Sequence, residues 1–265
     1  MRKNKLKEKL KKGDVLIGTA IMECRSPNLA QLFAAAGFDW LFIDSEHSSF
    51  SIETIASFVV SCKAADIGSI FRVPSKEHVY WITRYLDSGT QGIVVPHVET
   101  KQNVTRIIEA AKYYPSGKRG IAFELAHNDF QIFEKPSNIT ESANQETFVG
   151  IQIESIEAAE RIDELISVEG VDFAFIGPWD LSQSVGIPGE VKDAKVVKII
   201  SSVVRACKNH GVICGIAVGN DIDMAKNWIK EGVKMILISS DVGLIVEGGS
   251  IYTEKLKHFI RRNTG

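Results

Sequence analysis

Short runs of Val, Ile, Leu and Phe recur along the chain, and each run precedes turn residues and a longer stretch with helical periodicity. The runs are nearly continuous in apolar residues, which is typical of parallel strands covered on both faces. Eight runs occur, at residues 15–20, 39–43, 68–73, 91–96, 148–153, 172–177, 212–218 and 234–239. A strand and helix alternation that reaches eight favours an α/β closed (β/α)8 barrel, the TIM-barrel class, over an open doubly wound sheet.

The length of 265 residues suits one such barrel, and no low-complexity linker interrupts the chain. We therefore expect a single domain over residues 1–265. The longest interval, about 50 residues, separates the fourth and fifth runs. Loops of that length are usually lids, binding loops or flexible segments.

Composition narrows the function classes. Apolar residues make up 45% and charged residues 24% of the chain, and the net charge of -2 favours no nucleic acid as a partner. The first twelve residues hold seven Lys or Arg against one Glu, and the spacing of Leu6 and Leu10 predicts a short basic N-terminal helix. We expect a cytoplasmic protein with no membrane segment, because no run has the apolar length of a signal peptide or a membrane span. The four cysteines include no CxxC pair, which predicts reduced thiols.

Polar residues stand where several runs end. Asp44 and His47 follow the second run, Arg72 ends the third, Glu154 follows the fifth and Asp180 follows the sixth. In a barrel of parallel strands these ends share one rim, where the active sites of barrel enzymes lie. The carboxylates of Glu154 and Asp180 stand 26 residues apart, about one strand and helix repeat, and predict a divalent metal held by oxygen ligands.

Structural explanations compete with each of these assignments. Glu154 suits the first turn of a helix, and Asp180 suits an Asx turn. Asp87 suits a helix C-terminal turn, and we assign His97 a structural or outer-sphere role. The four remaining histidines have no strand-end context and are expected on helices or loops: His78, His127, His210 and His258.

Six collinear segments together resemble the HpcH/HpaI family of class II pyruvate aldolases, which includes 2,4-dihydroxyhept-2-ene-1,7-dioate aldolase and 2-keto-3-deoxy sugar acid aldolases. The resemblance spans residues 13 to 245 and implies a barrel of the phosphoenolpyruvate/pyruvate type. The segments are Phe42-Ile43-Asp44-Ser45-Glu46-His47, Phe71-Arg72-Val73-Pro74, Val94-Val95-Pro96-His97-Val98-Glu99-Thr100, Tyr114-Pro115-Ser116-Gly117-Lys118-Arg119-Gly120, Gln152-Ile153-Glu154-Ser155 and Phe175-Ile176-Gly177-Pro178-Trp179-Asp180-Leu181-Ser182.

The resemblance implies a reversible, metal-dependent cleavage of a 4-hydroxy-2-keto acid to pyruvate and an aldehyde. Glu154 and Asp180 match the ligands of Mg or Mn, with Co as a further option. Arg72 would stabilise the pyruvate enolate, and His47 would act as the general base.

The resemblance also implies supporting roles. Asp87 and Asp44 match acids that orient the histidine and shape the site. Gln152 would contact the metal and substrate, and the backbone at Trp179 and Asp180 would receive the pyruvate carboxylate. The family further implies a homo-oligomer, a hexamer.

Three departures from the family pattern concern specificity. Trp179 replaces a small residue, Ser45 replaces a common Gly, and segment 121–127 lacks the expected small residues and arginine. We expect these positions to face the acceptor aldehyde. Two alternatives stay open at this point, a CoA-ester lyase of the citrate-lyase-like branch and a non-catalytic barrel that binds a keto acid.

Overall fold

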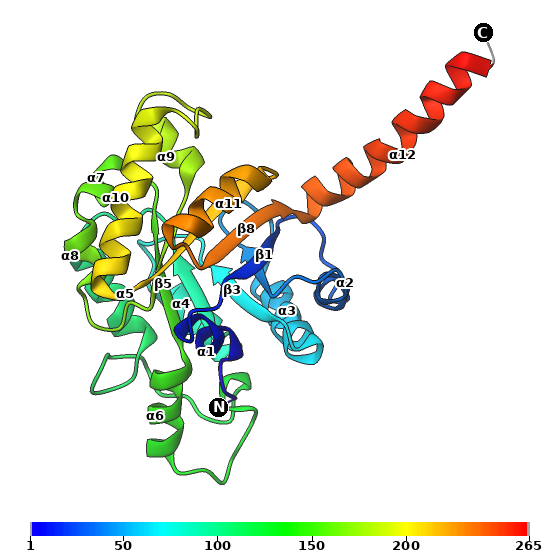
Figure 1. Ribbon diagram of the computed structural model, residues 1–265. Helices are drawn as coiled ribbons and strands as arrows, with labels where there is room; N and C mark the ends of the chain where they lie inside the picture. Colours follow the sequence, from blue (N-terminus) through cyan, green and yellow to red (C-terminus); the bar gives the residue numbers. More distant parts are fainter. Residues whose placement is uncertain (1, 264–265) are drawn as a thin grey trace.

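The computed structural model describes residues 2–263 and forms a closed barrel of parallel strands that follow one another in chain order (Figure 1). Each predicted run contains one strand, with bounds that differ by no more than one residue, so the predicted fold class is confirmed. The strands are β1 (Leu16–Ile21), β2 (Trp40–Asp44), β3 (Gly68–Arg72), β4 (Gly92–Val95), β5 (Phe148–Ile153), β6 (Phe173–Ile176), β7 (Ile213–Gly219) and β8 (Met235–Ser240).

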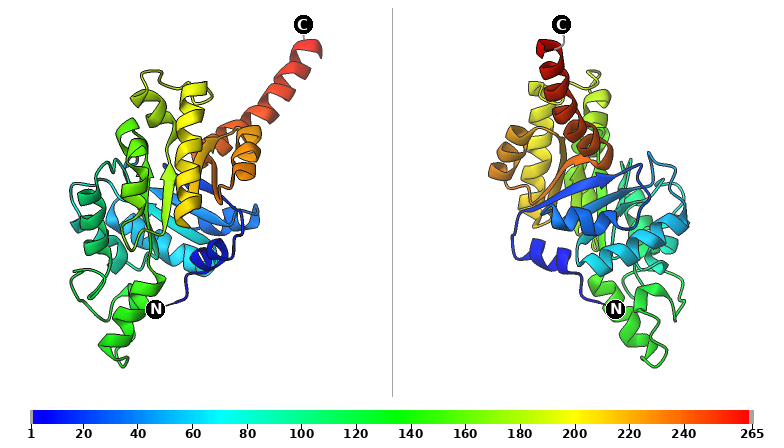
Figure 2. Two further views of the ribbon diagram at one scale, coloured as in Figure 1. Left: turned by 60° about the vertical axis from the view of Figure 1, so that its left-hand side comes forward. Right: turned by 90° about the vertical axis from the view of Figure 1, so that its right-hand side faces the viewer.

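Most of the helices cover the outside of the barrel, whereas α12 projects away from it (Figures 1 and 2). They are α1 (Lys5–Lys11), α2 (Leu29–Ala35), α3 (Ile52–Ala65), α4 (Tyr80–Asp87), α5 (Lys101–Ala111), the 3-10 turn η1 (Ala126–Asn128), α6 (Pro136–Glu146), α7 (Ile156–Glu160), α8 (Ile162–Ile166), α9 (Pro178–Ser184), α10 (Ala194–His210), α11 (Ile222–Glu231) and α12 (Asp241–Asn263). Among residues 2–263, no helix combines the length and apolar composition that crossing a lipid bilayer requires.

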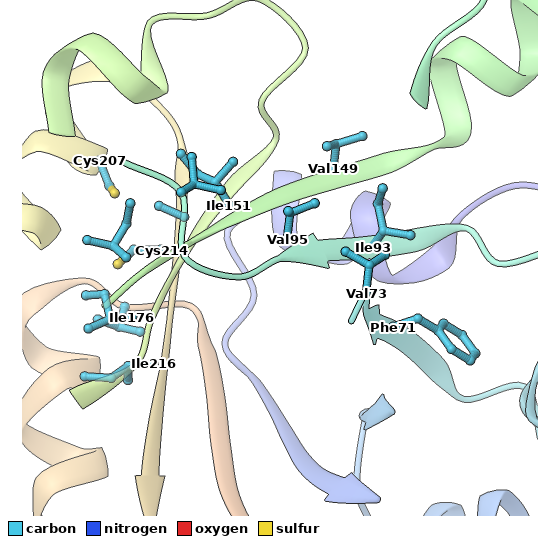
Figure 3. Close-up of a cluster of buried hydrophobic side chains, with 14 of the residues drawn as sticks. Phe71, Val73, Ile93, Val95, Val149, Ile151, Ile176, Cys207, Cys214 and Ile216 are labelled. Atoms are coloured by element: carbon cyan, nitrogen blue, oxygen red, sulfur yellow. The ribbon is translucent and has the colours of Figure 1, made fainter. Parts of the chain in front are cut away.

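Two hydrophobic layers hold the barrel. The outward-facing side chains of the strands pack against the helices, as Figure 3 shows for Val and Ile residues beside Cys207 and Cys214. The inward-facing side chains form a second layer in which Phe42 and Phe175 stack with ring centroids 5.4 Å apart. Because side chains alternate along a strand, the inner position two residues after Phe42 belongs to Asp44. The aromatic layer is therefore the floor under the polar residues of the rim.

Helix α1 closes the amino end of the barrel. It buries Leu6 and Leu10, the two leucines whose spacing predicted a helix, against the inner layer. The Nζ of Lys7 lies 2.9 Å from Asp172 Oδ1 and donates to the carbonyl of Thr147 at 3.0 Å. With this end closed, the carboxyl end is the one open to a substrate.

The long interval between β4 and β5 is not a lid. It contains α5, η1 and α6, and no residue between 101 and 147 lines the cavity described below. Helix α6 leads into the first residue of β5, at the amino end of the barrel. Most of the polar segment at 134–146 is helix α6, which packs through Ile139 and Ala143.

Candidate active site

Arg72 and Asp44 form a buried ion pair at the carboxyl ends of two neighbouring strands. Asp44 ends β2, Arg72 ends β3, and the two are partners in the sheet register. The guanidinium Nε donates to Asp44 Oδ1 at 2.8 Å, and Nη2 donates to Oδ2 at 2.5 Å. Burial opposes both charges, but the bonds between them outweigh it, so the pKa of Arg72 is raised and the pKa of Asp44 is lowered. The guanidinium is therefore charged and fixed in direction.

Glu46 and two histidines continue this network. Glu46 Oε2 lies 2.9 Å from Arg72 Nη1, and Glu46 Oε1 lies 2.8 Å from His97 Nε2. His47 Nε2 lies 3.8 Å from Glu46 Oε2, and the His47 side chain is 54% exposed. His47 is thus an accessible base beside a buried carboxylate.

Glu154 is buried directly after β5. Its Oε1 accepts a hydrogen bond from the backbone N–H of His97 at 2.6 Å, and its Oε2 accepts one from Gln152 Nε2 at 2.5 Å. Burial raises the pKa of Glu154, the contacts with His97 lower it, and the carboxylates of Glu46 and Asp180 raise it again. The net result is a raised pKa, and burial is its main cause.

A cavity of about 510 Å³ opens at this rim. Asp180 lines it from the first turn of α9, not directly from the end of β6, because Pro178 begins the helix immediately after Gly177. Trp179 borders the cavity with its ring against Gly219. The predicted site residues that line the cavity are Asp44, His47, Arg72, Gln152, Trp179 and Asp180.

The predicted metal position suits a divalent cation. Glu154 Oε2 stands beside Gly177, where an added Cβ would lie only 3.1 Å from it. The buried Oε1 of Gln152 has no hydrogen-bond partner among the described residues. Two carboxylates and a free amide oxygen are the donors that Mg²⁺ and Mn²⁺ prefer. Residues 2–263 contain no group of three or more His, Cys, Asp or Glu arranged to hold a metal, so waters and substrate would complete the coordination.

Asp87 and segment 121–127 lie elsewhere. Asp87 ends α4 and pairs with Arg119 at 2.6 Å, so the structure does not bring it to His47 of the same chain. Its role in orienting His47 stays a prediction. The expectation that segment 121–127 faces the acceptor is not met within this chain, because Ala126 lies against Gly89 before β4, at the amino end. Ser45 is buried and does not line the cavity.

Sequence reasoning assigned no role to Glu46 and only a structural or outer-sphere role to His97. Glu46 connects Arg72 to His97, and His97 connects Glu46 to Glu154. The available signal for Glu46 was its place between Asp44 and His47 at a strand end. His97 adopts a left-handed φ of 54°, and its backbone N–H donates to Glu154 Oε1; residue order reveals neither feature.

The HpcH/HpaI aldolase/citrate lyase family model matches residues 22–248. The chain is 30% identical to a hydroxypyruvate/pyruvate aldolase of Roseobacter denitrificans over 254 residues, which cover 96% of this chain and 97% of that one. It is 31% identical to a 5-keto-4-deoxy-D-glucarate aldolase of Salmonella arizonae over 96% and 95% of the two chains. The crystal structure of an HpcH/HpaI aldolase from Desulfitobacterium hafniense has a TM-score of 0.89 at 30% identity and covers 95% of this chain and 96% of that one.

The chain therefore belongs to the HpcH/HpaI aldolase/citrate lyase family. The predicted family and the predicted enzyme class, a carbon-carbon lyase, are both confirmed.

Proposed function

We propose that the protein is a metal-dependent aldolase that cleaves a 4-hydroxy-2-keto acid to pyruvate and an aldehyde, reversibly. The observation that carries this proposal is geometric: a buried arginine, ion-paired with Asp44, and the buried carboxylate of Glu154 lie around one cavity. Arg72 lines the cavity, and Glu154 stands behind Gln152 at its edge. The relatives named as aldolases support the aldol reaction, but they differ in substrate and so do not identify the substrate of this chain.

A divalent cation, when bound by Glu154 and Asp180, would act as a Lewis acid toward the 2-keto oxygen. Arg72 supplies a preorganised positive charge to the same oxygen, where negative charge develops as the enolate forms. Asp44 holds the guanidinium through two hydrogen bonds, so little reorganisation accompanies the reaction.

His47 is placed to move the proton. In the cleavage direction its ring nitrogen takes the proton of the C4 hydroxyl, directly or through one water, and the C3–C4 bond breaks to give the aldehyde and the pyruvate enolate. The protonated His47 then gives this proton to C3 of the enolate, directly or through one water, which releases pyruvate and restores the neutral base. In the synthetic direction the same nitrogen returns the proton to the new hydroxyl.

Exchange of the pyruvate C3 protons with D₂O tests these roles without any aldehyde. Arg72→Ala and His47→Ala are each expected to slow the exchange by at least about 100-fold, the size typical of general acid–base and charge-stabilising residues. The matched control is His210→Ala, which changes an exposed histidine at the end of α10, away from the cavity. Wild-type exchange in His47→Ala would remove His47 from the mechanism.

Metal binding has its own test. Titration of Mn²⁺ followed by electron paramagnetic resonance is expected to show affinity lost in Glu154→Gln and Asp180→Asn. Affinity is expected to persist in Glu164→Gln, which changes an exposed carboxylate on α8. Wild-type Mn²⁺ affinity in Glu154→Gln refutes the assignment. Comparing Mg²⁺, Mn²⁺ and Co²⁺ in the exchange assay identifies the preferred ion.

The remaining alternatives differ in product. A coupled assay for pyruvate from hydroxy-keto acids, run beside one for acetyl-CoA from CoA esters, separates an aldolase from a CoA-ester lyase. A metal-supplemented sample that catalyses neither reaction and binds keto acids would favour the non-catalytic barrel.

We also propose that the protein is a homo-oligomer. Helix α12 projects away from the barrel in both views (Figures 1 and 2), and Asp241 is its one buried residue among those described. Its apolar side chains Ile245, Val246, Leu256 and Phe259 are all at least 60% exposed. An apolar surface of this extent fits a second copy of the chain.

Light scattering coupled to size exclusion is expected to show an assembly, a hexamer by family resemblance, which Leu256→Glu with Phe259→Glu dissociates. Unchanged mass in this double variant would show that α12 does not hold the assembly.

A further inference from the structure

The two sides of the cavity differ in charge. The side formed by β2, β3, β5 and α9 carries Asp44, His47, Arg72 and Asp180. The opposite side, formed by β7, β8 and the residues that follow β1 and β8, carries no ionisable side chain among the described lining residues. Its members are Met22, Ala217, Asn220, Leu237, Ser239 and Ser240.

Arg72 is the one Lys or Arg among the described residues that line the cavity, and Asp44 and Glu46 hold it on the charged side. Nε and Nη2 bond Asp44, and Nη1 faces Glu46. Lys192 lies beyond Trp179 in a neighbouring groove, where it pairs with Asp221. A carboxylate on the opposite side would therefore lose water without gaining a cation, and the surrounding carboxylates would repel it.

Neutral polar groups are available on that side. Ser240 Oγ accepts the backbone N–H of Gly243 at 3.1 Å, which leaves its own hydroxyl hydrogen to donate. Asn220 Nδ2 donates to Glu247 Oε2 at 3.0 Å, which leaves the amide oxygen as an acceptor. The donor of Ser240 and the acceptor of Asn220 lie on the same side as apolar Met22 and Leu237. This combination suits a small aldehyde that carries hydroxyl groups.

We propose that the acceptor aldehyde is short, uncharged and hydroxylated, and that the opposite side of the cavity rejects aldehydes with a carboxylate. This inference rests on the proposed aldolase function, and it specifies the class of substrate. The pyruvate part occupies the charged side, and the aldehyde part extends toward Asn220 and Ser240.

The experiment uses the metal-supplemented enzyme and two matched pairs of acceptors with pyruvate. Glycolaldehyde is compared with glyoxylate, and butanal with succinic semialdehyde. We expect kcat/KM to favour the uncharged member of each pair by at least about 10-fold, because the opposite side offers a carboxylate no cation. We expect glycolaldehyde to exceed acetaldehyde, because acetaldehyde has no hydroxyl group for Ser240 and Asn220 to bind. Equal or better use of the charged members by the wild type overturns the proposal.

A charge-introducing variant provides a second measurement. Asn220 is exposed at the rim, so Asn220→Lys places a cation beside the neutral side without disturbing the core. The charged to uncharged kcat/KM ratio is expected to rise at least about 10-fold in Asn220→Lys and to stay at the wild-type value in Asn220→Gln. An unchanged ratio in Asn220→Lys refutes the placement of the aldehyde.

Pyruvate C3 exchange, measured in parallel, separates this inference from the proposed function. Exchange at the wild-type rate in Asn220→Lys shows that the variant is folded and enolises pyruvate. Failure of the wild type to exchange would overturn the aldolase assignment itself, and with it the acceptor class.

Discussion

Replacement of Asp241 by Asn is expected to destabilise the barrel where it closes. Asp241 is fully buried and accepts four backbone hydrogen bonds. Oδ1 bonds Met22 and Val242 at 3.1 and 2.9 Å, and Oδ2 bonds Glu23 and Cys24 at 3.1 and 2.7 Å. Asn keeps one acceptor oxygen and turns an NH₂ group toward two donors. Two hydrogen bonds to a charged group, at about 1.5 kcal/mol each, give a loss of about 3 kcal/mol.

The assay is thermal and urea unfolding of Asp241→Asn beside Asp223→Asn. Asp223 is a matched control because its carboxylate is 87% exposed and pairs with Lys226 at the surface. A loss of about 3 kcal/mol corresponds to a Tm lower by roughly 6–12 °C in a chain of this size, whereas the control is expected within about 1 °C of the wild type. If the Tm and the free energy of unfolding of Asp241→Asn equal those of its control, the hydrogen bonds to residues 22–24 do not stabilise the barrel by the amount given above.

Three further outcomes are expected. Gly177→Ala places a Cβ 3.1 Å from Glu154 Oε2 and should weaken Mn²⁺ binding about 10-fold, and unchanged affinity would contradict the close approach. Gly18→Ala places a Cβ against the fully buried Trp40 ring and should cost about 1–3 kcal/mol in urea unfolding, and wild-type stability would contradict this close approach. Burial and the charge of Arg119 lower the pKa of His127 to about 4, below the unfolded value, so unfolding takes up a proton and stability should fall by about 2 kcal/mol from pH 7 to pH 5. In His127→Gln the free energy of unfolding should change little between pH 7 and pH 5. If it still falls by about 2 kcal/mol, other titratable groups cause the pH dependence.

The barrel could be predicted from the sequence because strand position depends on short-range pattern. Runs such as Trp40 to Ile43 are apolar on both faces, and a parallel sheet covered by helices is the arrangement that buries both. The interval between β4 and β5 was harder, because the polar residues of α6 resemble a loop until Ile139 and Ala143 are seen to pack. Packing of that kind depends on residues distant in sequence.

The site was predictable where a residue's role follows from its strand. Arg72 and Glu154 stand at strand ends, and the barrel brings them to one rim. His97 received only a structural or outer-sphere role, because residue order does not show its contacts with Glu46 and Glu154. Its left-handed φ is one that a non-glycine residue seldom adopts. Asp87 illustrates a different difficulty. Its match to the family pattern predicts a role beside His47, but such a match does not identify the contacts of the side chain, and within this chain Asp87 pairs with Arg119.

Pairing of the first strand with the last has a consequence for synthesis. Leu16 in β1 pairs with Met235 in β8, so the edge of β1 lacks its partner until almost the whole chain has been translated. At about 5–20 residues per second, this interval lasts roughly 10–40 s. During it, Asp44 and Arg72 are present on a sheet whose free edge can pair with a neighbouring nascent chain. The speed of the ribosome therefore sets how long each copy is open to edge-to-edge association before its own last strand closes the ring.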